Sequence, residues 1–445
     1  MNKLLIKNAT IINENKRSLK DIYIEGEYIK EINTHIDLDD EVEIINAKGL
    51  LVIPGMIDDQ VHFREPGLTH KGDISSESMA AVAGGVTSYI EMPNTFPNTT
   101  SINEFYKKIE TASTKSFANF SFMFGGTNDN ISEIKKINKS EVAGVKLFLG
   151  SSTGKMLIDN LSAIENIFNS TKLPISAHCE DEQTIRDNTN YYKNIYGEDI
   201  PIELHPKIRS DKACLKSSEF AVKLANKTGA RLNVFHISTA KELKLFDNKI
   251  DIKNKKITAE VCAHHLWFTD NDYKKLGSKI KWNPAIKSQT DKDELWKALK
   301  EDKIDIIASD HAPHTEEEKN NKYLNCPSGG PMVQHTILSI LQNCENYGVK
   351  IEKIVEKIAH NPAIIFQINK RGFLREGYYA DIVLIDTNTP TFVTKDSLFY
   401  KCGWSPFEGQ KFDNSIYKTI LNGRVVYSDG KVKPLPIGKK LTFNR

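Results

Sequence analysis

Five side chains that can bind a metal ion are spread along the sequence, each within or close after an apolar run. They are His62, Lys146, His178, His236 and Asp310. A lone histidine at the end of a strand is more often a packed, partly buried residue than a ligand. If the runs are neighbouring parallel strands, however, their carboxyl ends meet at one mouth. Because imidazole and carboxylate groups are ligands that zinc prefers, the five residues together predict a metal centre.

Two of these residues indicate the chemistry. Lys146, in AGVKLFLG, has apolar neighbours, where an ammonium group is costly to bury unless it is paired. It either reaches solvent or a carboxylate, or stays neutral and reacts with carbon dioxide to give a carbamate that bridges two cations. Asp310, in SDHAPH, is either a helix N-cap or a metal ligand that moves a proton between water and a leaving nitrogen. The second reading of Asp310 predicts amide hydrolysis with this residue as the catalytic acid and base.

The elements that would position these residues are eight apolar runs separated by connections of helical length. We expect strands near residues 55–58, 86–90, 120–124, 145–149, 174–178, 232–236, 257–261 and 304–308. Helix-length connections imply parallel strands joined by right-handed crossovers, and eight such strands can close into a barrel. An open doubly wound sheet is the alternative, which the absence of Gly-x-Gly-x-x-Gly after the first strand weakens.

Both ends of the chain have a different pattern, with short alternating β runs punctuated by Gly and Asp. The sequence therefore predicts an α/β fold, a (β/α)8 TIM-type barrel with a small β-sandwich domain formed by both termini. We expect the barrel at residues 55–370 and the composite β domain at residues 1–54 plus 371–445.

Composition excludes several classes of protein. Lys and Arg total 60 against 58 for Asp and Glu, and the net charge of +2 gives no broad basic field for nucleic acid. No stretch nears the roughly 18 apolar residues of a membrane span. Six cysteines without a Cys-x-x-Cys pair favour reduced thiols in the cytoplasm. We expect a cytoplasmic protein with a small-molecule substrate and neither nucleic-acid nor membrane partners.

Nine segments distributed along almost the whole chain resemble the motifs of the dihydroorotases, which are cyclic amidohydrolases. The matching segments are PGMIDDQVHFREPGLTHKGD, AAVAGGVTSYIEMPNT, GVKLFLGSSTG, ISAHCED, FHIST, ASDHAPH, GYYADIVLID, CGWSPFEGQKF and LNGRVVYSDG. The resemblance implies the reversible interconversion of N-carbamoyl-L-aspartate and L-dihydroorotate in de novo pyrimidine biosynthesis. It also implies a homodimer.

The resemblance further implies a role for each site residue. Those expected to hold zinc are His62, Lys146 as a carbamate derived from carbon dioxide, His178, His236 and Asp310. Arg64 would bind the substrate carboxylate, a bidentate task suited to guanidinium. The residues that would complete substrate recognition are Asn94, Asn283 and His314. From the residues alone, a surface salt bridge for Arg64 and turn positions for the two asparagines are equally good readings.

The sequence departs from the family pattern at one position. Dihydroorotases usually carry His-x-His at the end of the first barrel strand, and here the two positions are Gln60 and His62. A glutamine amide is a poor zinc ligand beside imidazole. We therefore expect one zinc ion held firmly by Lys146, His178 and His236, and a second that is weak or absent. Gln60 would be left to hydrogen-bond a bridging water or the carbamate.

Two other functions remain open. The change at Gln60 also fits a dihydroorotase-like chain that has lost catalysis and serves as a structural partner of another pyrimidine enzyme. Against that reading, the remaining ligands and the anchors Arg64 and Asn94 are retained. A hydantoinase or allantoinase would share the barrel and the lysine, but a neutral hydantoin ring has no need of Arg64.

Overall fold

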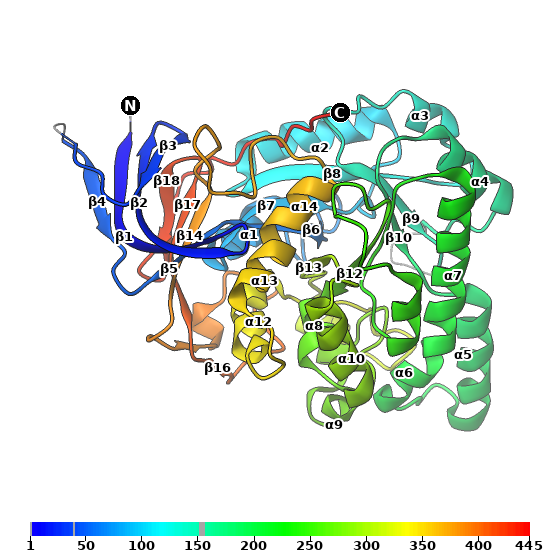
Figure 1. Cartoon of the computed structure of the whole chain (residues 1–445). Helices are drawn as coiled ribbons and strands as arrows, with labels where there is room; N and C mark the ends of the chain where they lie inside the picture. The colour runs from blue at the N-terminus through cyan, green and yellow to red at the C-terminus, as the bar shows by residue number, and fades with distance from the viewer. Residues whose placement is uncertain (1, 39–40, 151–155) are drawn as a thin grey trace.

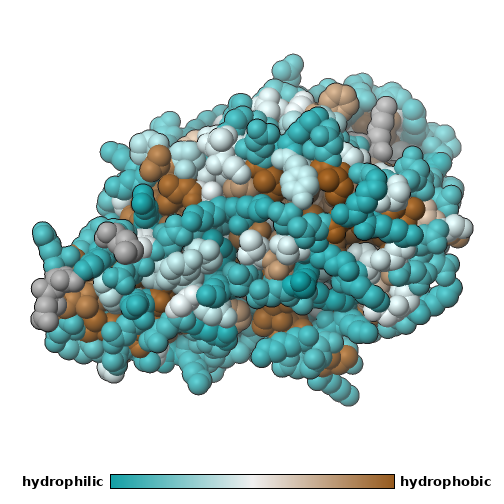
Figure 2. Space-filling model, turned by 90° about the horizontal axis from the view of Figure 1, so that it is seen from above, coloured by the Kyte–Doolittle hydropathy of each residue, from teal (hydrophilic) through white to brown (hydrophobic). Residues whose placement is uncertain are grey.

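The computed structural model describes residues 2–38, 41–150 and 156–445. The last four residues of the GVKLFLGSSTG motif, 151–154, therefore lie outside the described residues. Figure 1 shows a β domain containing the N-terminus beside a larger barrel wrapped by helices. None of the helices in the described ranges is both long and apolar enough to cross a bilayer. The face shown in Figure 2 is largely hydrophilic, with separate apolar patches.

The barrel consists of eight parallel strands that pair in chain order. They are β6 (Met56–Val61), β7 (Val86–Glu91), β8 (Asn119–Gly125), β9 (Gly144–Phe148), β10 (Ile175–His178), β11 (Leu232–Val234), β12 (Ile257–Cys262) and β13 (Ile306–Ala308). The first and last strands meet just beyond β13, where Val61 bridges His311 and the His62 N–H donates to the His311 carbonyl at 2.7 Å. All eight predicted strands and the predicted barrel are confirmed, and the open sheet is excluded.

Helices follow the strands and cover the outside of the barrel (Figure 1). The longer ones are α1 (Ile74–Ala83), α2 (Ile102–Lys115), α4 (Leu161–Ser170), α5 (Glu182–Tyr196), α7 (Asp211–Thr228), α10 (Gln289–Lys300) and α12 (Thr336–Cys344). The shorter ones are α3 (Ile131–Lys135), α6 (His205–Ile208), α8 (Ala263–Trp267), α9 (Tyr273–Leu276), α11 (Glu316–Lys319), α13 (Ile351–Val355) and α14 (Asn361–Ile365). Several begin at an Asp, Ser or Asn whose side chain accepts a backbone N–H of the first turn, as Asp73 does for α1.

The β domain is built from both ends of the chain, because β5 pairs antiparallel with β14. Its strands are β1 (Lys3–Asn13), β2 (Lys16–Glu25), β3 (Tyr28–Asn33), β4 (Glu43–Asn46), β5 (Leu51–Pro54), β14 (Ile382–Asp386), β17 (Ser415–Leu421), β18 (Arg424–Ser428) and β19 (Lys431–Val432). They form one continuous nine-stranded sheet. Side chains such as Ile24, Val52 and Ile382 pack into a core separate from that of the barrel. The β-rich domain expected from both termini is thus present.

The chain between β14 and β17 returns to the mouth of the barrel. It contains the two-residue strands β15 (Thr391–Phe392) and β16 (Lys411–Phe412), which pair antiparallel. Between these strands, the Trp404 indole N–H donates to the carbonyl of His314 at 2.7 Å. A segment from the C-terminal part of the sequence therefore supports the loop that follows the last barrel strand.

Candidate active site

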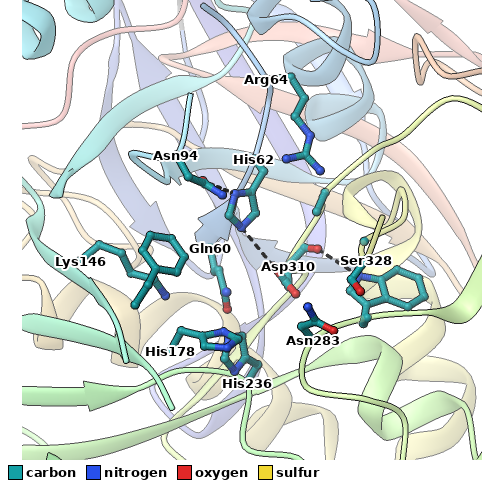
Figure 3. A pocket seen from close by; sticks show the side chains of 14 residues that line it. Gln60, His62, Arg64, Asn94, Lys146, His178, His236, Asn283, Asp310 and Ser328 are labelled. Atoms are coloured by element: carbon teal, nitrogen blue, oxygen red, sulfur yellow. Dashed lines mark hydrogen bonds and ion pairs between the residues drawn. The ribbon is translucent and has the colours of Figure 1, made fainter. Parts of the chain in front are cut away.

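A pocket opens at the carboxyl ends of the barrel strands and brings together eight of the nine predicted site residues (Figure 3). These eight are His62, Arg64, Asn94, Lys146, His178, His236, Asn283 and Asp310, and the remaining lining residues are Gln60, Phe148, Trp282, Ala312, Ser328 and Gly329. Side chains from strands far apart in the sequence meet here because parallel strands end at the same edge of a barrel.

Two histidines face each other on one side of the pocket. His178 Nδ1 lies 2.9 Å from His236 Nε2. On its other side, His178 Nε2 lies 3.0 Å from Glu180 Oε2, and Glu180 is also paired with Arg209. The nearby carboxylate favours a proton on Nε2, which leaves the Nδ1 lone pair facing His236. Burial lowers the pKa of both imidazoles, which keeps them neutral and able to bind a cation.

His62 and Asp310 form a second pair of donors. His62 Nε2 lies 3.3 Å from Asp310 Oδ1, and His62 Nδ1 lies 2.7 Å from Asn94 Oδ1. A proton on Nδ1 donated to the amide oxygen leaves the Nε2 lone pair facing Asp310. Asn94 therefore orients a predicted ligand, a role that the sequence gave no reason to expect.

Lys146 is the side chain that best tests whether these residues fit a metal ion. Its amine is fully buried, lies 3.8 Å from the centroid of the Phe235 ring and has no hydrogen-bond partner among the described residues. Burial lowers its pKa to about 8, and the carboxylates of Glu260 and Asp310 partly oppose that shift. An ammonium group without a partner is unfavourable here, whereas a carbamate bound to a cation would be satisfied. The donor set of two facing imidazoles and this lysine fits zinc.

Gln60 occupies the inner wall of the pocket. Its Oε1 lies 3.7 Å from the Cys262 thiol, which donates to it. The preceding Asp58 is fully buried, and this burial raises its pKa to about 7 although it accepts the Ser309 N–H at 3.1 Å. The floor beneath Gln60 is therefore polar, and it joins the first barrel strand to the last.

Arg64 brings a buried positive charge to the pocket. Its Nε donates to the Pro313 carbonyl at 2.9 Å, and Nη2 lies 3.0 Å from His314 Nε2. Burial lowers its pKa to about 10, so the guanidinium remains charged at neutral pH. No carboxylate oxygen of the described residues lies within 4.0 Å of it. The pocket thus offers a guanidinium that makes no direct ion pair within the described residues, although the charges of Asp310, Glu91 and Glu318 act on it from further away.

Comparisons with known proteins agree with this geometry. Residues 51–426 match the amidohydrolase family. The chain belongs to this family. It is 31% identical to a dihydroorotase of Methanosarcina mazei, over 97% of this chain and 95% of that protein. It is also 30% identical to an allantoinase of Desulfitobacterium hafniense, over 98% of both chains. An L-hydantoinase from Arthrobacter aurescens superimposes with a TM-score of 0.94 at 25% identity, covering 99% of this chain and 100% of that one.

This amidohydrolase is therefore a hydrolase of the cyclic amide class. The similar proteins are named dihydroorotase, allantoinase and L-hydantoinase. The similarity over the whole chain therefore does not identify which cyclic amide is the substrate. Members of the superfamily are generally metal-dependent, as the donor set in the pocket also suggests.

His314 is the predicted substrate residue that does not line the pocket. Its ring is buried behind Arg64, with Nδ1 3.1 Å from Lys71 Nζ and 3.3 Å from Glu318 Oε2. In this position it supports the guanidinium of Arg64. The sequence did not distinguish the two roles, because both place a histidine four residues after Asp310.

A second group of possible ligands lies beside the pocket. The ligand atoms of Cys262, His264 and His265 are within 4.8 Å of one another. The His264 ring is stacked on Trp282 at a centroid distance of 4.5 Å, and His265 Nε2 lies 3.1 Å from the Pro284 carbonyl. His264 is therefore packed against an indole ring, and His265 has a hydrogen-bond partner in the protein.

Sequence reasoning missed the residues that hold the ligands in place. Glu180 follows His178 by two positions, and this spacing in ISAHCED was an available signal. Glu77 gave no such signal, because its contact with the site runs through His311, 234 residues away.

Proposed function

We propose that this amidohydrolase is a dihydroorotase, which interconverts N-carbamoyl-L-aspartate and L-dihydroorotate in de novo pyrimidine biosynthesis. The observation that carries the proposal is Arg64, a charged guanidinium at the pocket with no carboxylate of the described residues within 4.0 Å. The guanidinium contacts the neutral Pro313 carbonyl and the His314 imidazole. A substrate carboxylate would supply an opposite charge at hydrogen-bonding distance. Both proposed reactants carry that carboxylate, whereas unsubstituted hydantoin and allantoin do not.

The residues expected to hold zinc divide into two sets. Lys146 as a carbamate, His178 and His236 would hold one ion firmly, and His62 with Asp310 would hold a second more weakly because Gln60 adds no imidazole. Bound there, zinc would supply Lewis acidity that makes water more acidic and polarises the amide carbonyl.

The chain's own groups would bind the substrate and move the proton. Arg64 would bind the carboxylate in a bidentate manner, with Asn94 and Asn283 contacting the rest of the molecule. In the hydrolytic direction, the Asp310 carboxylate accepts a proton from the attacking water and passes it to the ring nitrogen. One C–O bond forms, the C–N bond of the ring breaks, and Asp310 is returned to its carboxylate form.

A panel of substrates tests the proposal. Purified protein supplied with zinc and bicarbonate is assayed with dihydroorotate, carbamoyl aspartate, allantoin and hydantoin. We expect dihydroorotate and carbamoyl aspartate to be turned over with a kcat/KM at least about 100-fold above that for the neutral rings. Turnover of only the neutral rings would reject the assignment.

A second candidate is an allantoinase or hydantoinase. It is supported by the 30% identity to the Desulfitobacterium allantoinase and by the close structural match to the Arthrobacter L-hydantoinase. The same panel separates it from the first. A catalytically inactive partner of another pyrimidine enzyme would instead bind zinc tightly and turn over none of the four compounds.

A further inference from the structure

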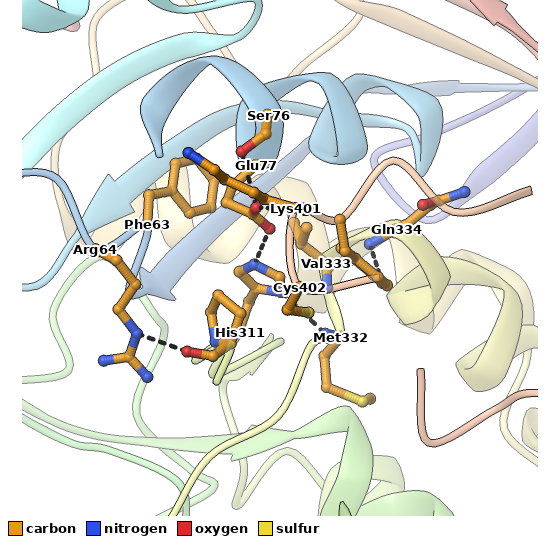
Figure 4. A network of polar contacts seen from close by, with 12 residues as sticks. Phe63, Arg64, Ser76, Glu77, His311, Met332, Val333, Gln334, Lys401 and Cys402 are labelled. Atoms are coloured by element: carbon orange, nitrogen blue, oxygen red, sulfur yellow. Dashed lines mark hydrogen bonds and ion pairs between the residues drawn. The ribbon is translucent and has the colours of Figure 1, made fainter. Parts of the chain in front are cut away.

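A buried carboxylate outside the pocket joins three distant segments of the chain. Glu77 lies on α1 and is fully buried. One oxygen lies 2.7 Å from His311 Nε2, and the other accepts the Lys401 backbone N–H at 3.0 Å and the Ser76 hydroxyl at 2.9 Å. Figure 4 shows these groups converging on Glu77. Since every neighbour in this set donates, the site requires a group that only accepts.

Each ring nitrogen of His311 has a hydrogen-bond partner, and these partners fix its tautomer. Its Nδ1 accepts the backbone N–H of Met332 at 2.9 Å and lies 3.3 Å from that of Val333. Nδ1 is therefore unprotonated, so Nε2 carries the hydrogen that is donated to Glu77. The ring also meets Phe63 edge-on at 5.7 Å and stacks on Tyr400 at 5.3 Å. Glu77 thus completes a fully specified environment for His311.

His311 lies at the seam that closes the barrel. Its carbonyl accepts the His62 N–H at 2.7 Å, and it directly follows Asp310. Asp310 has a φ of +45°, in the left-handed region that residues other than glycine seldom adopt. Such a conformation persists only where the surrounding structure imposes it. The next residue, His311, is held by the contacts described above, and the Asp310 carboxylate faces His62 at 3.3 Å.

We infer that Glu77 is a positioning residue for Asp310, acting through His311 to hold the loop after the last barrel strand in its left-handed conformation. Glu77 does not line the pocket, so it has no contact with a substrate there. The inference rests on the proposed role of Asp310, because only that role makes the orientation of its carboxylate matter for turnover.

The test compares two substitutions that each replace a buried carboxylate by an amide of equal size. Glu77→Gln must turn its NH2 group toward at least one donor. Asp305→Asn is the matched control, because Asp305 is also buried, accepts from Lys255 Nζ at 2.7 Å and from the Ala259 N–H at 2.9 Å, and lies just before β13, at the opposite end of that strand from Asp310.

We expect Glu77→Gln to lower kcat by about 100-fold, with zinc content unchanged and KM within about 3-fold, because a small misplacement of a reacting group has effects of that size. Asp305→Asn should lower Tm but leave kcat close to that of the wild type. Equal kcat losses in the two variants, or loss of zinc from Glu77→Gln, would overturn the inference.

Hydrogen exchange measured by mass spectrometry gives a readout that is independent of turnover. Peptides covering residues 309–314 and 332–333 should exchange faster in Glu77→Gln and at the wild-type rate in Asp305→Asn. Unchanged exchange in Glu77→Gln would contradict the positioning role. If the wild type turns over none of the substrate panel, the proposed function fails while this measurement still decides the role of Glu77.

Discussion

The two halves of the pocket are held in place by different kinds of contact. We call Lys146, His178 and His236 the metal half; Lys146 and His178 lie within β9 and β10, and His236 lies two residues after β11. We call His62, Arg64 and Asp310 the seam half, which lies just beyond the ends of β6 and β13. The metal half follows from the register of neighbouring strands, in which Lys146 pairs with Ser176 and Phe148 with His178.

The seam half depends on contacts from outside the strands. Arg64 and Asp310 have φ values of +72° and +45°, and in the metal half only His236 has a positive φ, of +42°. His62 is oriented by Asn94, and the loop of Asp310 by His311 and Glu77. The comparison indicates that the barrel strands place the side chains proposed to hold a cation, whereas loop contacts place those proposed to handle substrate and proton.

The largest expected effect is on the metal half. Lys146→Ala should remove the firmly bound zinc and reduce kcat/KM by more than about 100-fold, since even the loss of an outer partner of a metal ligand has effects up to that size. A short carboxylic acid should restore part of the activity by replacing the carbamate. Zinc analysis and steady-state kinetics measure both effects.

Lys255→Ala is the control for this substitution, because Lys255 is also a buried lysine but pairs with Asp305. It should keep its zinc. A fully active Lys146→Ala protein would exclude the carbamate.

The next largest effect is expected at Asp310. Asp310→Asn preserves size but cannot take up the proton, so kcat should fall about 100- to 10,000-fold. The zinc ion of the metal half should remain bound, which metal analysis checks. If zinc is lost as completely as in Lys146→Ala, the division into two halves is wrong.

Arg64→Ala should act mainly on binding. The loss of charge-assisted hydrogen bonds to the substrate carboxylate should raise KM for dihydroorotate by about 10- to 100-fold. Arg64→Lys, which retains the charge without the planar fork, should lie between the alanine variant and the wild type. Unchanged kinetics in Arg64→Ala would remove this residue from the site and, with it, the main support for dihydroorotase.

The smallest effect is expected at Gln60. Gln60→His adds an imidazole to the wall between the two halves, so the zinc content should rise toward two ions per chain while kcat changes less than about 10-fold. Gln60→Ala serves as the control, with zinc content like that of the wild type. A histidine variant that gains no zinc would show that Gln60 is not what limits the second ion.

Much of the fold and of the pocket lining could be predicted from sequence. The eight apolar runs mark the barrel strands because parallel strands are buried on both faces and read as nearly continuous hydrophobic segments. His62, Lys146, His178, His236 and Asp310 could be grouped because each lies within or just beyond such a run. His314 satisfied the same criterion, but its ring lies behind Arg64 and contacts Lys71 and Glu318, so it does not line the pocket.

The sequence by itself determined which types of side chain reach the mouth of the barrel, since strand period and strand ends are local properties of the chain. Only the tertiary structure decided that no carboxylate of the described residues lies within 4.0 Å of Arg64, that Asn94 orients His62, and that Glu77 meets His311. These properties depend on distances between residues as many as 234 positions apart, which no local pattern encodes.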